Sequence, residues 1–277
     1  MRLKYWLYIC IEFKNQYIMS IIRKPLLSTN NVKTMKGEKL GYKTYIMYLS
    51  PFTQNSKGIN VCSHASKGCA EACLFGSGFG GIYSNVEQGR IRKTEYFLSN
   101  RIEFMFQLKS EIEKAIRINK DKAIVTFRLN GTSDLPFEKY RVFEGDKNIF
   151  ELFPDVDFYD YTKNHLRMTK ELPKNYHLTF SRSETNEIKA LELLNAGYNV
   201  AMVFDALPES YKGFKVVNGD LDDLRFKDEK NVIVGLKYKK MTGKGADNSL
   251  AFTSGFAIQT LPTKIAKVVK KRILEAA

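Results

Sequence analysis

Short apolar runs recur along most of the chain, separated by segments with helical spacing or with turn residues. The runs are rich in β-branched and aromatic residues, and most are continuously apolar rather than alternating. Strands that are apolar on both faces are typical of parallel sheets covered by helices. We therefore expect an α/β fold: a complete or partial β/α barrel of the TIM type, or alternatively an open doubly wound sheet. The predicted strands are 42–49, 123–129, 156–162, 176–181, 198–204, 214–217, 231–238 and 255–259.

Helical spacing is strongest between the first two of these runs. Ser84-Asn85-Val86-Glu87 has the pattern of a capping box, which predicts that a helix begins at Ser84. From Leu98 to Ile116, apolar residues recur at three- and four-residue steps, which indicates one long helix or a broken pair. Two shorter helices are expected over 187–195 and 263–274.

Composition and continuity favour one globular domain. Of the 277 residues, 44% are hydrophobic and 27% charged, which excludes both a disordered polymer and a membrane bundle. No repeat, low-complexity tract or linker divides the chain, so we expect a single domain over 19–277. Residues 1–18 precede a second methionine and are interpreted as an upstream extension. Their apolar part is too short to span a bilayer, and no signal cleavage site follows it.

Three of the four cysteines are clustered behind the first predicted strand. Cys62, Cys69 and Cys73 are spaced C-x6-C-x3-C in a loop that precedes the first long helix. Three thiolates on one loop suit a 4Fe-4S cluster that leaves one iron open for a ligand other than cysteine. The alternatives are a zinc site, for which His64 is the local fourth candidate, and three reduced cysteines in a core. In a barrel, this loop lies on the face where the carboxyl ends of the strands meet.

Glycines and cations follow the cysteines. Gly78 and Gly80 belong to a glycine-rich stretch that either approaches a bound cofactor or lets the loop wrap around a cluster. Arg90 and Lys93 lie in the early part of the next predicted helix, where cations oppose the helix dipole. A bound anion or cofactor would compensate for that placement, and a solvated basic face is the alternative.

Polar residues recur where the predicted strands end, which is the usual location of site residues in β/α folds. Arg128, Asn130 and Asp134 follow the second strand, and Lys163 follows the third. These four are our candidates for binding or polarising a small anionic substrate. Other strand-end residues are Tyr159, Tyr161, Ser181, Arg182, Ser183, Asp205, Asn218, Asp220 and Lys237.

Several long polar motifs occur together in this chain. They are LLSTNNVKTMKGEKLGYKTYIMYLSP, the C-x6-C-x3-C loop with its glycine-rich tail, RIRKT, RLNGTSDLPFE and YDYTK. Taken together, over residues 26–252, the sequence resembles the bacteriophage gene product 88 family. The resemblance implies a phage origin and a shared cysteine cluster, and it supplies no reaction. For a phage protein made in the infected host we expect a location in the host cytoplasm.

The leading hypothesis is a phage-encoded protein that binds one 4Fe-4S cluster through the three clustered cysteines. The open iron would act as a Lewis acid in hydration or hydrolysis, or the cluster would take part in redox chemistry. Whether the protein is an enzyme stays open at this stage. The rival is a zinc-stapled nucleic-acid-binding protein, since 44 Lys and Arg against 30 Asp and Glu give a net charge of +14. A third interpretation is a host-interaction protein whose metal only stabilises the cysteine loop. No membrane partner is expected.

Overall fold

A computed structural model describes residues 24–29, 32–73, 83–241 and 247–260. The strands are β1 (Leu27–Ser28), β2 (Tyr42–Met47), β3 (Ile124–Arg128), β4 (Phe158–Thr162), β5 (Tyr176–Ser181), β6 (Val200–Phe204), β7 (Ser210–Tyr211), β8 (Phe214–Asn218), β9 (Ile233–Lys237) and β10 (Ala257–Ile258). The helices are α2 (Val32–Glu38), α3 (Lys67–Glu71), α5 (Ser84–Ser99), α6 (Arg101–Asn119), α7 (Ile149–Leu152), α8 (His165–Met168), α9 (Glu187–Asn195) and α10 (Leu250–Thr253), with two 3-10 turns, η2 (Phe137–Lys139) and η3 (Arg225–Lys227). The extension 1–18 and the helix expected over 263–274 lie outside the described residues.

The strands form one mostly parallel sheet in the order β1-β2-β3-β4-β5-β6-β9-β8-β7, and β10 lies beside β6. The short edge strands β1 and β7 are antiparallel to their neighbours. The order from β2 to β6 follows the sequence, as in a β/α barrel, and lacks the reversal of a doubly wound sheet. In the described part of the chain the two ends of the sheet do not pair, so the expected α/β class is confirmed and a complete barrel is not formed.

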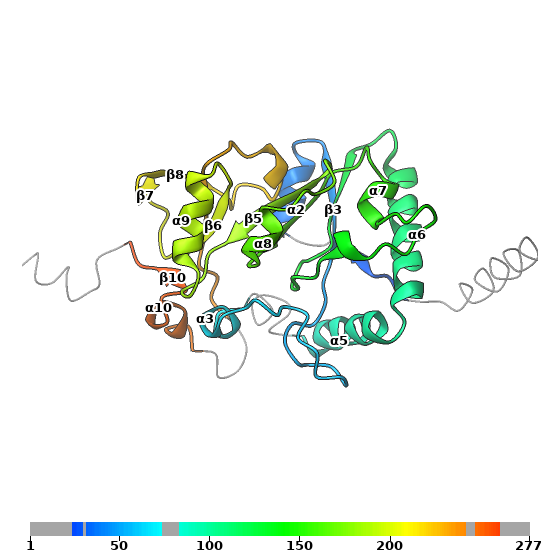
Figure 1. Cartoon of the computed structure of the whole chain (residues 1–277), viewed down its shortest axis with the longest axis horizontal. Coiled ribbons are helices and arrows are strands. Elements are labelled where there is room, and N and C mark those ends of the chain that lie inside the picture. Colours follow the sequence, from blue (N-terminus) through cyan, green and yellow to red (C-terminus); the bar gives the residue numbers. More distant parts are fainter. Residues whose placement is uncertain (1–23, 30–31, 74–82, 242–246, 261–277) are drawn as a thin grey trace, which may run out of the picture.

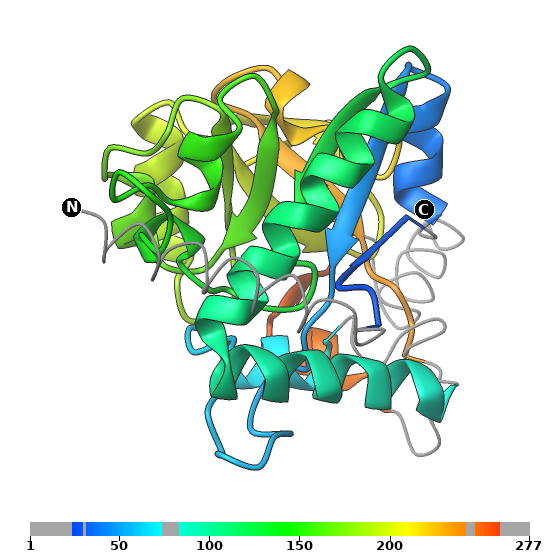
Figure 2. The same cartoon turned by 90° about the vertical axis from the view of Figure 1, so that its right-hand side faces the viewer.

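The first core lies between the helices and one face of the sheet. Phe127 stacks on Tyr45 and Phe158 across three neighbouring strands, and α6 covers this aromatic row (Figure 2). The predicted long helix is a broken pair, since α5 ends at Ser99 and α6 begins at Arg101. The start at Ser84 is confirmed, but the capping box is not: Tyr83 is the N-cap and no side chain caps the helix.

The second face of the sheet is covered by the segment after β8. Phe226 of η3 contacts the rings of Tyr42, Tyr159 and His177, which belong to β2, β4 and β5. The Arg128 guanidinium at the end of β3 pairs with Asp223 at 2.6 Å. The two ends of the sheet are therefore joined by side chains rather than by a backbone ladder.

Three helices lie along one edge of the sheet, where the parallel strands end. Figure 1 shows α3, α5 and α10 together on this side, and α3 packs against α10. No described helix has the length and apolar composition needed to cross a membrane.

Candidate functional site

A cavity of about 240 Å³ opens at the carboxyl edge of the sheet. We call it the thiol cavity, because Cys62, Cys69 and Cys73 all line it. The four predicted strand-end candidates also line it: Arg128, Asn130, Asp134 and Lys163. Its other lining residues are Ala72, Gly131, Thr132, Ser133, Tyr161, Thr162, Ser181, Val203, Asp220, Asp223, Leu236, Lys237, Tyr238, Lys239 and Phe256.

The helix that carries Cys69 is fixed by contacts with a distant part of the chain. Ser66 caps α3 by accepting the Cys69 N–H at 3.2 Å, and its hydroxyl donates to Glu184 at 2.7 Å. Glu184 also accepts the Gly68 N–H at 2.8 Å. Because Glu184 follows β5, one carboxylate attaches the cysteine helix to the middle of the sheet. Sequence reasoning missed this role, because nothing in the sequence around Glu184 distinguishes it from other loop acids before the fold brings it to Ser66.

Gly68→Ala is expected to lower the free energy of unfolding by about 1–3 kcal/mol. A Cβ atom at this position would lie 2.5 Å from Ser254 Oγ and 2.9 Å from Ser254 Cβ, so α3 would have to move away from α10. Urea denaturation measures the loss. The control is Gly89→Ala in α5, where a Cβ meets no described atom within 4 Å, and there alanine should add about 0.5–1 kcal/mol. Equal effects at the two sites would contradict the packing described for α3.

The thiols have a cationic neighbour at the end of β4. Lys163 Nζ donates to Ser181 Oγ at 2.9 Å and hydrogen-bonds the side chain of Cys69. Burial lowers the pKa of Lys163, but Cys69 and Cys62 in their ionised forms, together with the Asp134 carboxylate, outweigh that effect, so the pKa lies above its ordinary value.

Burial also acts on the thiols themselves. It raises the pKa of the Cys62 thiol to about 12, and the Lys163 ammonium opposes this rise. Arg90 of α5 does not line the thiol cavity, but it interacts electrostatically with Cys73: burial lowers the pKa of its guanidinium, and Tyr48 and Cys73 oppose the effect. Within the described residues, no group of three or more His, Cys, Asp or Glu side chains is close enough to hold a single metal ion.

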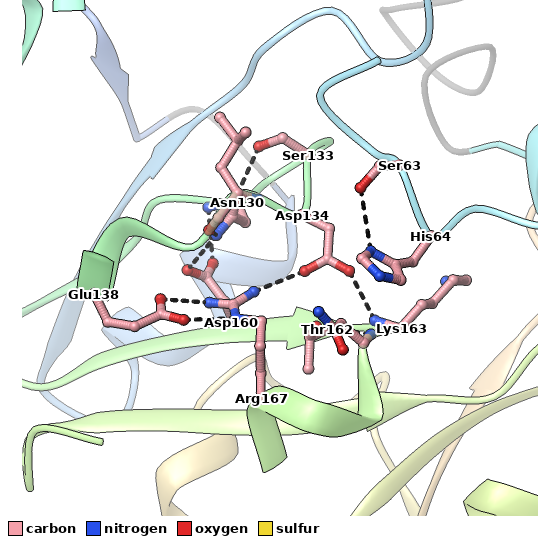
Figure 3. Close-up of polar contacts among 12 residues, drawn as sticks. Ser63, His64, Asn130, Ser133, Asp134, Glu138, Asp160, Thr162, Lys163 and Arg167 are labelled. Atoms are coloured by element: carbon pink, nitrogen blue, oxygen red, sulfur yellow. Dashed lines mark hydrogen bonds and ion pairs between the residues drawn. The ribbon is translucent and has the colours of Figure 1, made fainter. Parts of the chain in front are cut away.

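Two of the predicted ligand-binding residues use their polar atoms to shape the cavity wall. Asn130 donates to Asp160 at 3.2 Å and to the Leu135 carbonyl at 3.0 Å, and its Oδ1 accepts from Ser133 and from the Leu135 N–H, both at 2.8 Å (Figure 3). Asp160 is completely buried, and burial raises its pKa to about 6 despite the nearby Arg128. The amide nitrogen and oxygen of Asn130 are therefore both used in hydrogen bonds that stabilise the turn after β3.

Asp134 is the second of these residues. One carboxylate oxygen accepts from Arg167 at 2.7 Å, and the other accepts the Lys163 backbone N–H at 2.9 Å (Figure 3). Its own N–H donates to the Val61 carbonyl at 2.9 Å, directly before Cys62. Asp134 thus joins the cysteine loop to the end of β4. Arg167 completes this network with Glu138 through a two-pronged contact at 2.9 and 2.8 Å. Sequence reasoning missed it because it lies in α8, a short helix after β4 that was not predicted.

The remaining predicted site residues lie elsewhere. Lys93 does not line the thiol cavity; its ammonium donates to the Leu26 carbonyl at 2.8 Å. Burial lowers the pKa of Lys93 to about 8, with Glu111 opposing and Arg92 adding to the effect. The structure thus places Lys93 beside the segment before β1, and its role in cofactor binding stays a prediction. Gly78 and Gly80 lie outside the described residues. His64 is exposed and outside the cavity lining, with Nδ1 3.2 Å from Ser63 Oγ.

Comparison with known proteins places the chain in a family. No curated protein and no solved structure matches it. The family model described as gene product 88 matches residues 25–257, which is most of the chain and contains all three clustered cysteines and the strands β1 to β9. This confirms the resemblance suggested by the polar motifs. The chain belongs to the gene product 88 family.

Proposed function

We propose that this phage protein acts in the host cytoplasm and binds one 4Fe-4S cluster through Cys62, Cys69 and Cys73. The observation that carries the proposal is that three thiols, separated by C-x6-C-x3-C spacing, line one cavity at the carboxyl edge of a parallel sheet. This edge is where β/α barrels place their sites, and we interpret the curved, unclosed sheet as a partial barrel.

The donor set suits a cluster better than a single ion. Thiolates are the preferred ligands of iron–sulfur clusters, and each of the three would bind a different iron. The cysteine ligands of a cluster therefore lie farther apart than the ligands of a single metal ion. In the described residues the three thiols line one cavity but are not close enough to bind one ion, and this spacing is compatible with a cluster. The exposed position of His64 leaves it outside this donor set.

The charges around the thiols also favour an anionic occupant. Lys163 has no carboxylate within ion-pair distance among the described residues, and its side chain is directed to Cys69 and Ser181. A half-buried ammonium needs a counter-charge, since leaving it uncompensated costs desolvation energy. Thiolates bound to iron would supply that negative charge.

The rest of the cavity is available to a substrate or second ligand of the open iron. Val203, Leu236 and Phe256 give it an apolar wall, and Lys237 and Lys239 stand at its exposed side. Arg128 is held by Asp223, so its guanidinium is partly committed to the fold. This combination favours a small organic anion, on which the open iron would act as a Lewis acid or through which it would exchange electrons.

A serine–lysine nucleophile is the other chemistry that the contacts suggest, because Lys163 Nζ lies 2.9 Å from Ser181 Oγ. That mechanism requires a neutral lysine as general base. The thiolates of Cys69 and Cys62 raise the pKa of Lys163 despite its burial, which holds the ammonium charged. We therefore assign Lys163 to the thiols rather than to Ser181 activation.

The test is anaerobic purification of the full chain, followed by an absorbance spectrum and by iron, sulfide and zinc analysis. We expect about four iron and about four sulfide per chain, with broad absorbance near ~400 nm. Cys73→Ala should lose the iron, whereas Cys10→Ala, which changes the fourth cysteine, should keep it. A colourless protein with about one zinc would overturn the proposal and make the loop a structural zinc site. Nucleic-acid binding, to which the charge of +14 is suited, would then be measured as a function of salt.

A further inference from the structure

Two cations from different elements flank the cysteines of the thiol cavity. Lys163 extends from the end of β4 and hydrogen-bonds the Cys69 side chain. Arg90 comes from α5, lies with its guanidinium 5.1 Å from the centre of the Tyr48 ring, and interacts electrostatically with Cys73. Lys163 lines the cavity together with the thiols, whereas Arg90 is not part of the lining and acts on Cys73 at longer range.

The Asp134 carboxylate lies in the same cavity wall but makes no ion pair with the Lys163 ammonium among the described residues. One of its oxygens pairs with Arg167 at 2.7 Å and the other accepts the Lys163 backbone N–H. Arg167 also pairs with Glu138, so its single charge is shared between two carboxylates. Asp134 therefore offsets part of the Lys163 charge, and Lys163 acts on the thiols through its contact with the Cys69 side chain.

We propose that Lys163, with Arg90 in support, is a positioning residue that raises the reduction potential of the cluster. This inference rests on the proposed function. An iron–sulfur cluster gains one negative charge when it takes up one electron, and a nearby cation stabilises that charge. N–H donation to a cysteine sulfur acts in the same direction, because it withdraws electron density from the ligand. The contact of Lys163 with Cys69 therefore stabilises the reduced cluster relative to the oxidised one.

The experiment compares midpoint potentials in the full chain, with dithionite as the one-electron reductant and mediator dyes for equilibration. Lys163→Met removes both the charge and the donor, so its potential should fall below that of the unchanged protein. Lys163→Arg keeps both and should stay close to the original value. The matched control is Lys237→Met, which removes an exposed lysine from the same cavity and should shift the potential much less.

Arg90→Met tests the inference independently at Cys73, and it should also lower the potential. Iron content is measured on every sample first. A Lys163→Met protein that retains its iron at an unchanged potential overturns the inference and leaves the proposed function intact. Absence of iron from the unchanged protein overturns both.

Discussion

Arg167→Met is expected to lower the free energy of unfolding by about 3–5 kcal/mol, the range for removing one partner of a buried ion pair. The Arg167 side chain is 4% exposed and pairs with both Asp134 and Glu138. Methionine fills part of the space but leaves two carboxylates without their cation in a poorly hydrated site. Urea denaturation at neutral pH measures the change.

The matched control for this prediction is Arg141→Met. Arg141 also pairs with two carboxylates, Asp146 and Glu151, but its side chain is 41% exposed. Water solvates the carboxylates that remain, so little or no change in stability is expected. Comparable losses in the two variants would show that burial of the Arg167 network contributes nothing.

Arg128→Met is expected to cost a similar amount, about 3–5 kcal/mol, for a different structural reason. Arg128 ends β3, and its partner Asp223 lies 95 residues later, after β8. Their side chains are 12% and 2% exposed. The pair is one of the contacts that join the two ends of the sheet, so its loss should destabilise both halves together.

A double-mutant cycle separates the interaction energy of Arg128 and Asp223 from the destabilisation that each single substitution causes. Asp223→Asn should also be destabilising, because it removes the anion that compensates Arg128. The double variant removes both charges, so neither is left buried without its partner. Its loss in free energy of unfolding should therefore be about 0.5–3 kcal/mol smaller than the sum of the two single losses. Simple additivity would mean that the two side chains do not interact across the sheet.

The central strands could be predicted from the sequence because each is a continuous apolar run. The runs at 176–181 and 187–195 match β5 and α9 residue for residue. The two-residue edge strands β1 and β7 carry no such signal, since their pairing depends on a neighbour elsewhere in the chain. Helix α2 was also missed: it lies in the polar stretch 28–39, and its packing on β2 and near Leu224 exists only in the folded chain.

The location of the candidate site could be predicted from the sequence, but the roles of several of its residues could not. Polar residues at strand ends do line the thiol cavity, because the carboxyl ends of parallel strands meet at one edge. The sequence could not show that Asn130 is hydrogen-bonded to Asp160 or that Asp134 is paired with Arg167, since those partners come from other elements. Glu184 and Asp223 were missed for the same reason: each acquires its role from a residue about a hundred positions away.

The docking of α3 has a consequence for the order of events during protein synthesis. The Val61 carbonyl beside Cys62 accepts from the Asp134 N–H, and this contact lies within the first half of the chain. The helix of Cys69 instead needs Glu184, and it packs against α10, which ends at Thr253. Nearly the whole chain must therefore leave the ribosome before the three cysteines can share their cavity. Binding of the proposed cluster would then follow translation rather than accompany it.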